Sequence, residues 1–90
     1  MLSNTNRTKL FNEIKKLEDK TKDFKLHESN IRVIEITYSY SLLMDEVRIF
    51  VWNDNPLEIT KYYKEEVTNE NVKQIILNMR GVINHEISKR

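Results

Sequence analysis

The alternation of apolar and polar residues places a helical segment near each end of the chain. Between about Thr5 and Phe24, apolar residues recur on one stripe of a helix, at Leu10, Ile14, Leu17 and Phe24. A longer stripe predicts a second helix, capped by Thr68 or Asn69 and ending near Ser88; it comprises Val72, Ile75, Ile76, Met79, Val82, Ile83 and Ile87. This helix either runs through Gly81, because the apolar pattern stays in phase beyond it, or ends there.

The middle of the chain has the two-residue period of β-strands. Residues 31–40 alternate and are rich in β-branched and aromatic side chains, residues 47–52 return after a connection at 41–46, and residues 57–63 form a third run. Between the last two runs, Asn53-Asp54-Asn55-Pro56 has the composition of a turn. The end of the third strand is open, because Tyr63 and Val67 also fit the four-residue spacing of a helix.

These segments predict an α+β fold in a single domain, residues 1–90: a helix, a three-stranded antiparallel meander and a second helix. Both helices must bury their apolar stripes, so we expect both on one face of the sheet. The covered face is expected to carry Ile34, Ile36, Tyr38, Val47, Ile49, Val51, Leu57 and Ile59. The other face is then expected to carry Ile31, Val33, Arg48, Phe50, Trp52 and Thr60.

The strand at residues 47–52 is apolar on both faces, unlike a strand with one side in water. Phe50 and Trp52 can each bury about 150 to 250 Å², and exposed apolar patches of a few hundred Å² usually mark contact sites. The alternative is that other parts of the same chain cover these rings. Arg48 between the two aromatic residues favours an interface. We therefore predict a surface that binds a protein partner, or a second copy in a homodimer, formed by Ile31, Val33, Arg48, Phe50 and Trp52.

Composition narrows the class of protein. The chain has no cysteine, no apolar run long enough to span a membrane and no secretory signal, so we expect a cytoplasmic protein without a membrane partner. Its 15 basic and 14 acidic side chains argue against duplex nucleic acid as a partner. The absence of alanine beside ten each of Asn, Ile and Lys is typical of an AT-rich genome. This composition indicates an origin in a low-GC bacterium, its phage or another mobile element. We hypothesise that the chain is a phage or mobile-element protein that inhibits or modulates a host protein.

No motif in the chain indicates a chemical reaction. His27 and His85 each precede a glutamate, but neither has the spacing of a helical zinc-binding pair. We therefore predict a protein that is not an enzyme and holds no metal or cofactor. The alternative function is a small nucleic-acid-binding protein that stacks tyrosines on unpaired bases beside its lysines; the candidates are Tyr38, Tyr40, Tyr62 and Tyr63.

Two segments bear on a family resemblance. The second helix begins Thr68-Asn69-Glu70-Asn71-Val72-Lys73, and the strand connection reads Asn53-Asp54-Asn55-Pro56. The order of helix, three strands and helix resembles the double-stranded RNA-binding domain over a similar length. That family has a lysine cluster at the first segment and a Gly-Pro-x-His element in a strand-connecting loop, and this chain has neither. The resemblance concerns topology, and no function is carried over from it.

Overall fold

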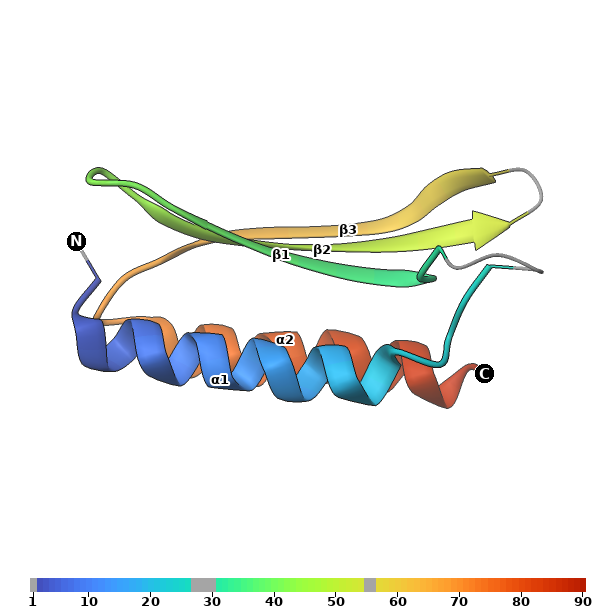
Figure 1. Ribbon diagram of the computed structural model, residues 1–90, viewed down its shortest axis with the longest axis horizontal. Helices are drawn as coiled ribbons and strands as arrows, with labels where there is room; N and C mark the ends of the chain where they lie inside the picture. Colours follow the sequence, from blue (N-terminus) through green and yellow to red (C-terminus); the bar gives the residue numbers. More distant parts are fainter. Residues whose placement is uncertain (1, 27–30, 55–56) are drawn as a thin grey trace.

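The computed structural model describes residues 2–26, 31–54 and 57–90 of the chain. Its elements follow in the order α1 (Asn4–Thr21), β1 (Ile34–Tyr40), β2 (Asp45–Asp54), β3 (Leu57–Val67) and α2 (Val72–Ser88). The strands form one antiparallel sheet in the order β1-β2-β3, and both helices lie along one of its faces (Figure 1). This arrangement confirms the predicted α+β fold, with its meander and its single helix layer.

The first helix begins at a cap and ends a little earlier than predicted. The backbone N–H of Asn6 donates to the hydroxyl of Ser3 across 3.2 Å, which satisfies one of the free N–H groups of the first turn. At the other end, the buried hydroxyl of Thr21 donates to the carbonyl oxygen of Leu17 across 3.0 Å. The N–H of Phe24 then donates to the Thr21 carbonyl, so the chain turns after Thr21.

The second helix continues through Gly81 to Ser88, as the unbroken apolar phase predicts. Thr68 and Asn71 close the turn that leads into it: the Asn71 N–H donates to the Thr68 hydroxyl (3.2 Å), and the Thr68 N–H donates to the Asn71 side-chain oxygen (2.7 Å). The side-chain oxygen of Asn69 accepts the backbone N–H of Ser3 across 2.9 Å. The bond between Ser3 and Asn69 holds the starts of the two helices side by side.

The core fills the space between the sheet and the helix layer. On the central strand β2, Val47, Ile49 and Val51 are at most 2% exposed. The helices cover them with their apolar stripes, whose buried members are Leu10, Ile14 and Leu17 of α1 and Val72, Ile75, Met79 and Ile83 of α2. This face of β2 is therefore removed from water from Asp45 to Val51.

The prediction that Leu57 and Ile59 face the helices is wrong, because β3 contains a β-bulge at Thr60. The pairing register shifts between Val51 and Trp52 of β2, and the Thr60 hydroxyl donates to the Val51 carbonyl oxygen across 3.3 Å. One extra residue reverses the side to which the preceding side chains point. Leu57 and Ile59 consequently stand on the uncovered face, 59% and 45% exposed. Beyond the bulge β3 continues as a strand to Val67, so the helical alternative there is also wrong.

The prediction that Val33 lies on the uncovered face is wrong too. Val33 is 6% exposed and belongs to the core. The chain bends at this residue: the Val33 N–H donates to the Phe24 carbonyl across 2.9 Å, while the Val33 carbonyl accepts the Trp52 N–H across 2.8 Å. Regular alternation therefore starts at Ile34, three residues later than the sequence pattern indicates. Asn55 and Pro56 of the predicted turn lie outside the described residues.

Two buried carboxylates join the helices to their neighbours. Glu13 of α1 receives two hydrogen bonds from Arg80 of α2, at 2.7 and 2.9 Å, and these bonds hold the pKa of Glu13 below its ordinary value. Glu86 of α2 pairs with Lys61 of β3 across 3.0 Å. Burial alone would raise the pKa of Glu86, but the hydrogen bond and charge of Lys61 outweigh it, helped by Lys89, and lower the pKa.

Candidate protein-binding surface

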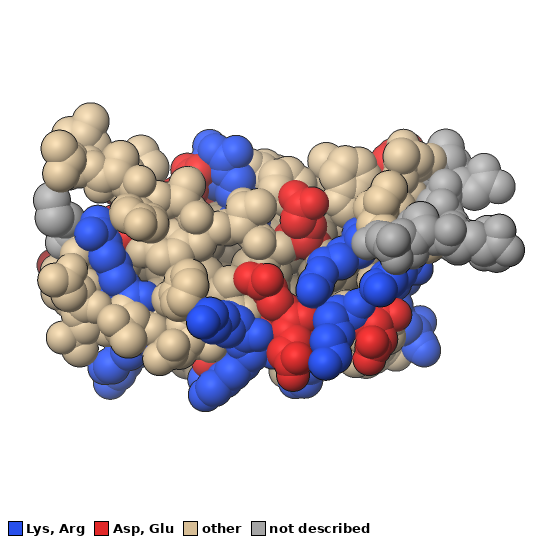
Figure 2. All heavy atoms as spheres, in the orientation of Figure 1, with Lys and Arg blue, Asp and Glu red and all other residues tan. Residues whose placement is uncertain are grey.

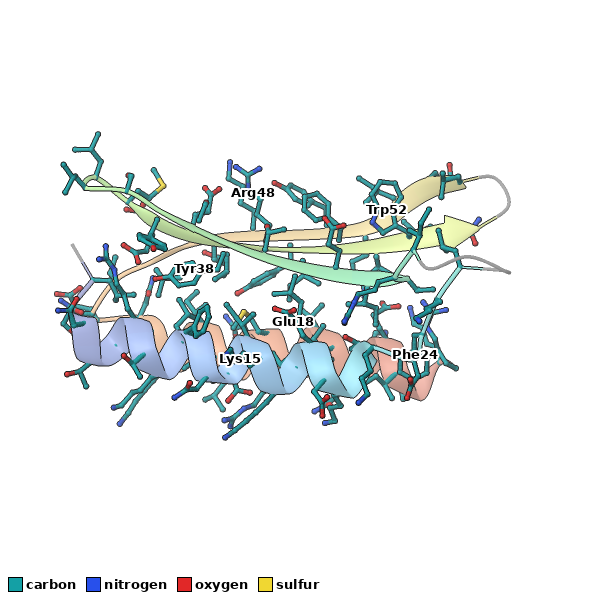
Figure 3. The ribbon with its side chains drawn as sticks, in the orientation of Figure 1. Lys15, Glu18, Phe24, Tyr38, Arg48 and Trp52 are labelled. Carbon is teal, nitrogen blue, oxygen red and sulfur yellow. The ribbon has the colours of Figure 1, made fainter. Side chains whose placement is uncertain are left out.

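The sheet face opposite the helices carries no described helix. Figure 3 shows Arg48 and Trp52 pointing away from the helix layer, whereas Tyr38 points toward it. Directly paired residues of antiparallel strands share a face. Phe50, two residues from both Arg48 and Trp52, lies opposite Tyr62 of β3. The register thus gathers aromatic side chains of β2 and β3 on the uncovered side.

Five apolar side chains form a continuous group on this face, near the end of β2 and the start of β3. The ring of Phe50 lies 5.1 Å from that of Tyr62, tilted by 31°, a favourable aromatic geometry. Trp52 lies opposite Ile59. The two β2 rings are partly buried, whereas Tyr62 is 50% exposed. We name this group the aromatic cluster; its members are Phe50, Trp52, Leu57, Ile59 and Tyr62.

Charged side chains next to the aromatic cluster interact with one another. Arg48 donates through Nε to Glu46 Oε1 across 2.7 Å, and its Nη2 lies 2.6 Å from the same oxygen. Lys64 lies 3.7 Å from the other oxygen of Glu46. The hydrogen bond and the charge of Glu46 raise the pKa of Arg48, so the guanidinium stays charged and paired. This part of the face therefore presents one carboxylate and two cations that already interact.

The structure brings together three of the five residues predicted to form the surface. Arg48, Phe50 and Trp52 share the uncovered face. Val33 is buried, and Ile31, although 55% exposed, precedes β1 and lies outside its ladder with β2. The three cluster members from β3 are absent from the predicted set. The bulge brings two of them to this face, and a bulge of this kind has no fixed sequence signature.

Among the described residues, the most exposed apolar side chains lie elsewhere, at the turn between β1 and β2. Leu42 and Leu43 are 83% and 90% exposed, and Met44 is 43% exposed. The sequence pattern predicts residues 41–46 only as a connection. A signal was available, because three consecutive apolar residues stand where tight turns usually hold Gly, Asn, Asp or Ser. We name residues 41–44 the hairpin tip.

A buried polar network fixes the base of this hairpin. Asp45, 2% exposed, accepts two hydrogen bonds from Arg7 of α1, Nε to Oδ2 at 2.9 Å and Nη2 to Oδ1 at 3.0 Å. The hydroxyl of Tyr38 also donates to Asp45 Oδ2. Burial alone would raise the pKa of Asp45, but these hydrogen bonds outweigh it and lower the pKa. Burial and the neighbouring carboxylate raise the pKa of Tyr38 far above its ordinary value.

The described residues contain no group of three or more His, Cys, Asp or Glu side chains that could hold a metal ion. His85 is exposed on α2, and His27 lies outside the described residues. None of the described helices has the length and apolar character needed to cross a lipid bilayer.

Comparisons with protein-family models, curated proteins and solved structures found no match to this chain.

Proposed function

We propose that this chain is a small non-catalytic protein-binding module whose contact surface is the aromatic cluster. One observation carries the proposal: five apolar side chains adjoin on a sheet face that no described helix covers. Tyr62 alone, about half exposed, leaves on the order of 100 Å² open to water. At about 25 cal/mol per Å², covering it contributes roughly 2 to 3 kcal/mol.

The charges on this face indicate the chemistry of the partner. Arg48 and Lys64 are both engaged by Glu46, so the cations beside the aromatic cluster already have an anionic partner. A nucleic acid binds chiefly through cations that are available to its phosphates. An uncharged, apolar protein surface fits the cluster better, because covering it leaves these ion pairs at the polar rim. The partner we propose is therefore a protein with such a surface, and the chain inhibits or modulates it by occupying that surface.

The experiment uses the position of the only tryptophan. Trp52 belongs to the aromatic cluster, so its fluorescence should change when a partner covers the cluster. Proteins retained from a bacterial extract by the immobilised chain are identified, purified and titrated against it. The test variant is Ile59→Ser with Tyr62→Ser, whose side chains are 45% and 50% exposed and can be truncated with little loss of packing.

We expect a purified partner to shift Trp52 emission and to bind the double variant at least about tenfold more weakly than the wild type. The matched control is Leu42→Ser with Leu43→Ser at the hairpin tip, which should bind as the wild type does. Equal affinity of the cluster variant and the wild type for every purified partner contradicts the proposal. So does salt-dependent binding of single-stranded DNA or RNA that the cluster variant abolishes, because this result favours the nucleic-acid alternative.

A further inference from the structure

The hairpin tip is a second apolar feature, separate from the aromatic cluster. It projects at the upper left end of the sheet in Figure 1, where β1 returns into β2. The same corner of Figure 2 consists mostly of uncharged atoms. Leu42 and Leu43 keep more than four-fifths of their surface in water. Two adjacent leucines with this much exposed apolar surface can act as an anchor in a protein contact.

The tip has a fixed shape. The Ser41 hydroxyl accepts the backbone N–H groups of Leu43 (3.1 Å) and Met44 (3.2 Å). The Ser41 N–H donates to the Met44 carbonyl across 2.9 Å. Immediately after the tip, Asp45 is held by Arg7. The leucines are therefore presented on a closed turn, which reduces the entropy that a partner must remove on binding.

The tip has an acidic flank on the side of Leu43 and Met44, whereas Arg7 lines its other side, next to Ser41 and Leu42. A hollow of about 150 Å³ separates Leu43 and Met44 from Glu66 and Glu70, and no Lys or Arg lines it. Glu66 and Glu70 are exposed, and no ion pair joins either of them to another described residue. The tip therefore combines an apolar anchor with an acidic flank.

The outer surface of the helix layer has the opposite character. A groove of about 300 Å³ between α1 and α2 has an apolar floor of Ile76 and Leu77. Its other lining residues are cationic: Lys9, Lys73 and Arg80. Leu77 is 56% exposed, and no ion pair joins Lys9 or Lys73 to another described residue. The groove thus offers an apolar pocket with a basic rim.

We propose that the hairpin tip of one copy of this chain docks into the helix groove of a second copy. Leu42 and Leu43 would cover Ile76 and Leu77, while Glu66 and Glu70 would approach the lysines of the rim. Tip and groove are different surfaces, so the contact is head to tail and produces rings or open chains of copies. An anionic lipid surface fits the tip poorly, because the acidic flank repels it.

A charge exchange tests this pairing directly. The tip variant carries Glu66→Lys and Glu70→Lys, and the groove variant carries Lys9→Glu and Lys73→Glu. Each variant alone sets like charges opposite each other, so we expect association to weaken at least about tenfold in sedimentation velocity at several concentrations. Mixing the two variants restores opposite charges at both kinds of contact, because each basic tip meets an acidic groove and each acidic tip a basic groove. The mixture should therefore recover the association of the wild type.

A second variant tests the apolar part of the contact, which Leu42 and Leu43 supply. Leu42→Ser with Leu43→Ser removes both anchors without touching the core, and we expect the dissociation constant of self-association to rise at least about tenfold. Leu57→Ser, an exposed leucine (59%) in the aromatic cluster, is the control and should associate as the wild type does. Circular dichroism of each variant verifies that the fold is retained.

Three results overturn the proposal. The first is a wild-type chain that stays monomeric at every concentration. The second is a self-association that survives both the leucine and the charge variants, or that is lost with Leu57→Ser. The third is sedimentation of the wild type with vesicles of anionic or neutral lipid that the leucine variant abolishes. A loss with Leu57→Ser would place the second copy on the aromatic cluster. The other results leave open whether that cluster binds a foreign protein, so failure of the tip proposal is distinguishable from failure of the proposed function.

Discussion

Asp45 fixes the point at which the β1–β2 hairpin leaves the core. Its carboxylate is almost fully buried and receives hydrogen bonds from Arg7 of α1 and Tyr38 of β1. The guanidinium of Arg7 also lies 5.1 Å from the ring centre of Tyr40, which it faces. Arg7 of the helix layer thereby contacts both strands next to the hairpin tip: β1 through Tyr40 and β2 through Asp45. A buried carboxylate is costly unless all its oxygens are satisfied, and here each oxygen has a donor.

The first prediction concerns this carboxylate. Asp45→Asn keeps the size of the side chain but removes its charge and one acceptor, leaving Arg7 and Tyr38 incompletely paired. We expect the free energy of unfolding to fall by roughly 1 to 3 kcal/mol in urea titrations at neutral pH. Glu35→Gln, exposed on β1, is the control and should change it by less than about 0.5 kcal/mol. If Asp45→Asn changed the free energy of unfolding by no more than the control does, the structural role assigned to Asp45 would be contradicted.

At the scale of elements, α2 contains a residue that neither helix propensity nor packing explains. Gly81 lies in the middle of the helix and is exposed. A Cβ added at this position would meet no atom within 4 Å, and the backbone there has no positive φ that would favour glycine. The helix persists through Gly81 because Val82 and Ile83 beyond it pack on the core.

The second prediction follows from that geometry. Gly81→Ala should stabilise the protein by about 1 kcal/mol, because alanine loses less backbone entropy in a helix. For a domain of this size, the melting temperature should rise by roughly 4 to 8 °C in calorimetry. Gly81→Pro is the opposite control, and we expect a loss of about 3 kcal/mol or more from the interrupted helix. An alanine variant that melts at or below the wild-type temperature would mean that the helix is strained at this position.

The order and type of the elements could be predicted from the sequence because periodicity is local. The stripe on α2 and the alternation around Ile49 each depend on a few adjacent residues, and both are confirmed. The side to which Leu57 and Ile59 point depends on a bulge at Thr60, which is set by pairing with β2. A pattern read along β3 alone cannot reveal that Thr60 is an extra residue relative to β2.

The candidate surfaces show the same division between local and non-local information. Phe50 and Trp52 are apolar on the face away from the helices, and the structure places them there. Their cross-strand neighbours Tyr62 and Ile59 bury them in part, which the order of residues along the chain does not reveal. The hairpin tip was visible in the sequence as Leu42-Leu43-Met44, but its exposure depends on how far the hairpin curves away from the helix layer (Figure 1). That extent is a property of the assembled molecule.

At the scale of the whole molecule, two buried carboxylates connect the sheet to the helix layer, and a third joins the two helices. Glu13 joins α1 to α2, Asp45 joins β2 to α1 through Arg7, and Glu86 joins α2 to β3. Each has a cationic partner on a different element. Because a small domain has only a modest apolar core, such links account for a larger share of its stability than they would in a larger protein. The ionisation state of the three carboxylates therefore governs how firmly the layers hold together.

The last prediction is a loss of stability in acid. The pKa values of Glu13, Asp45 and Glu86 are all lowered in the folded protein. A carboxylate with a lowered folded pKa stabilises the fold fully above its unfolded pKa, about 4, and loses that contribution as the pH falls through the folded pKa. We expect the free energy of unfolding to stay nearly constant between about pH 5 and 7 and to decrease steeply below about pH 4. Urea titrations at a series of pH values measure this directly.

The variant Glu13→Gln tests whether the carboxylate of Glu13 contributes to this loss of stability in acid. Glu13→Gln cannot ionise, so it should be less stable than the wild type at pH 7, and the difference should narrow as the pH falls and the wild-type carboxylate takes up its proton. Glu65→Gln, exposed on β3, should instead follow the wild-type curve throughout. If Glu13→Gln runs parallel to the wild type down to about pH 2, the acid sensitivity arises elsewhere. The link between α1 and α2 would then rest on packing, because Arg80 would contribute as much beside a neutral side chain as beside a charged one.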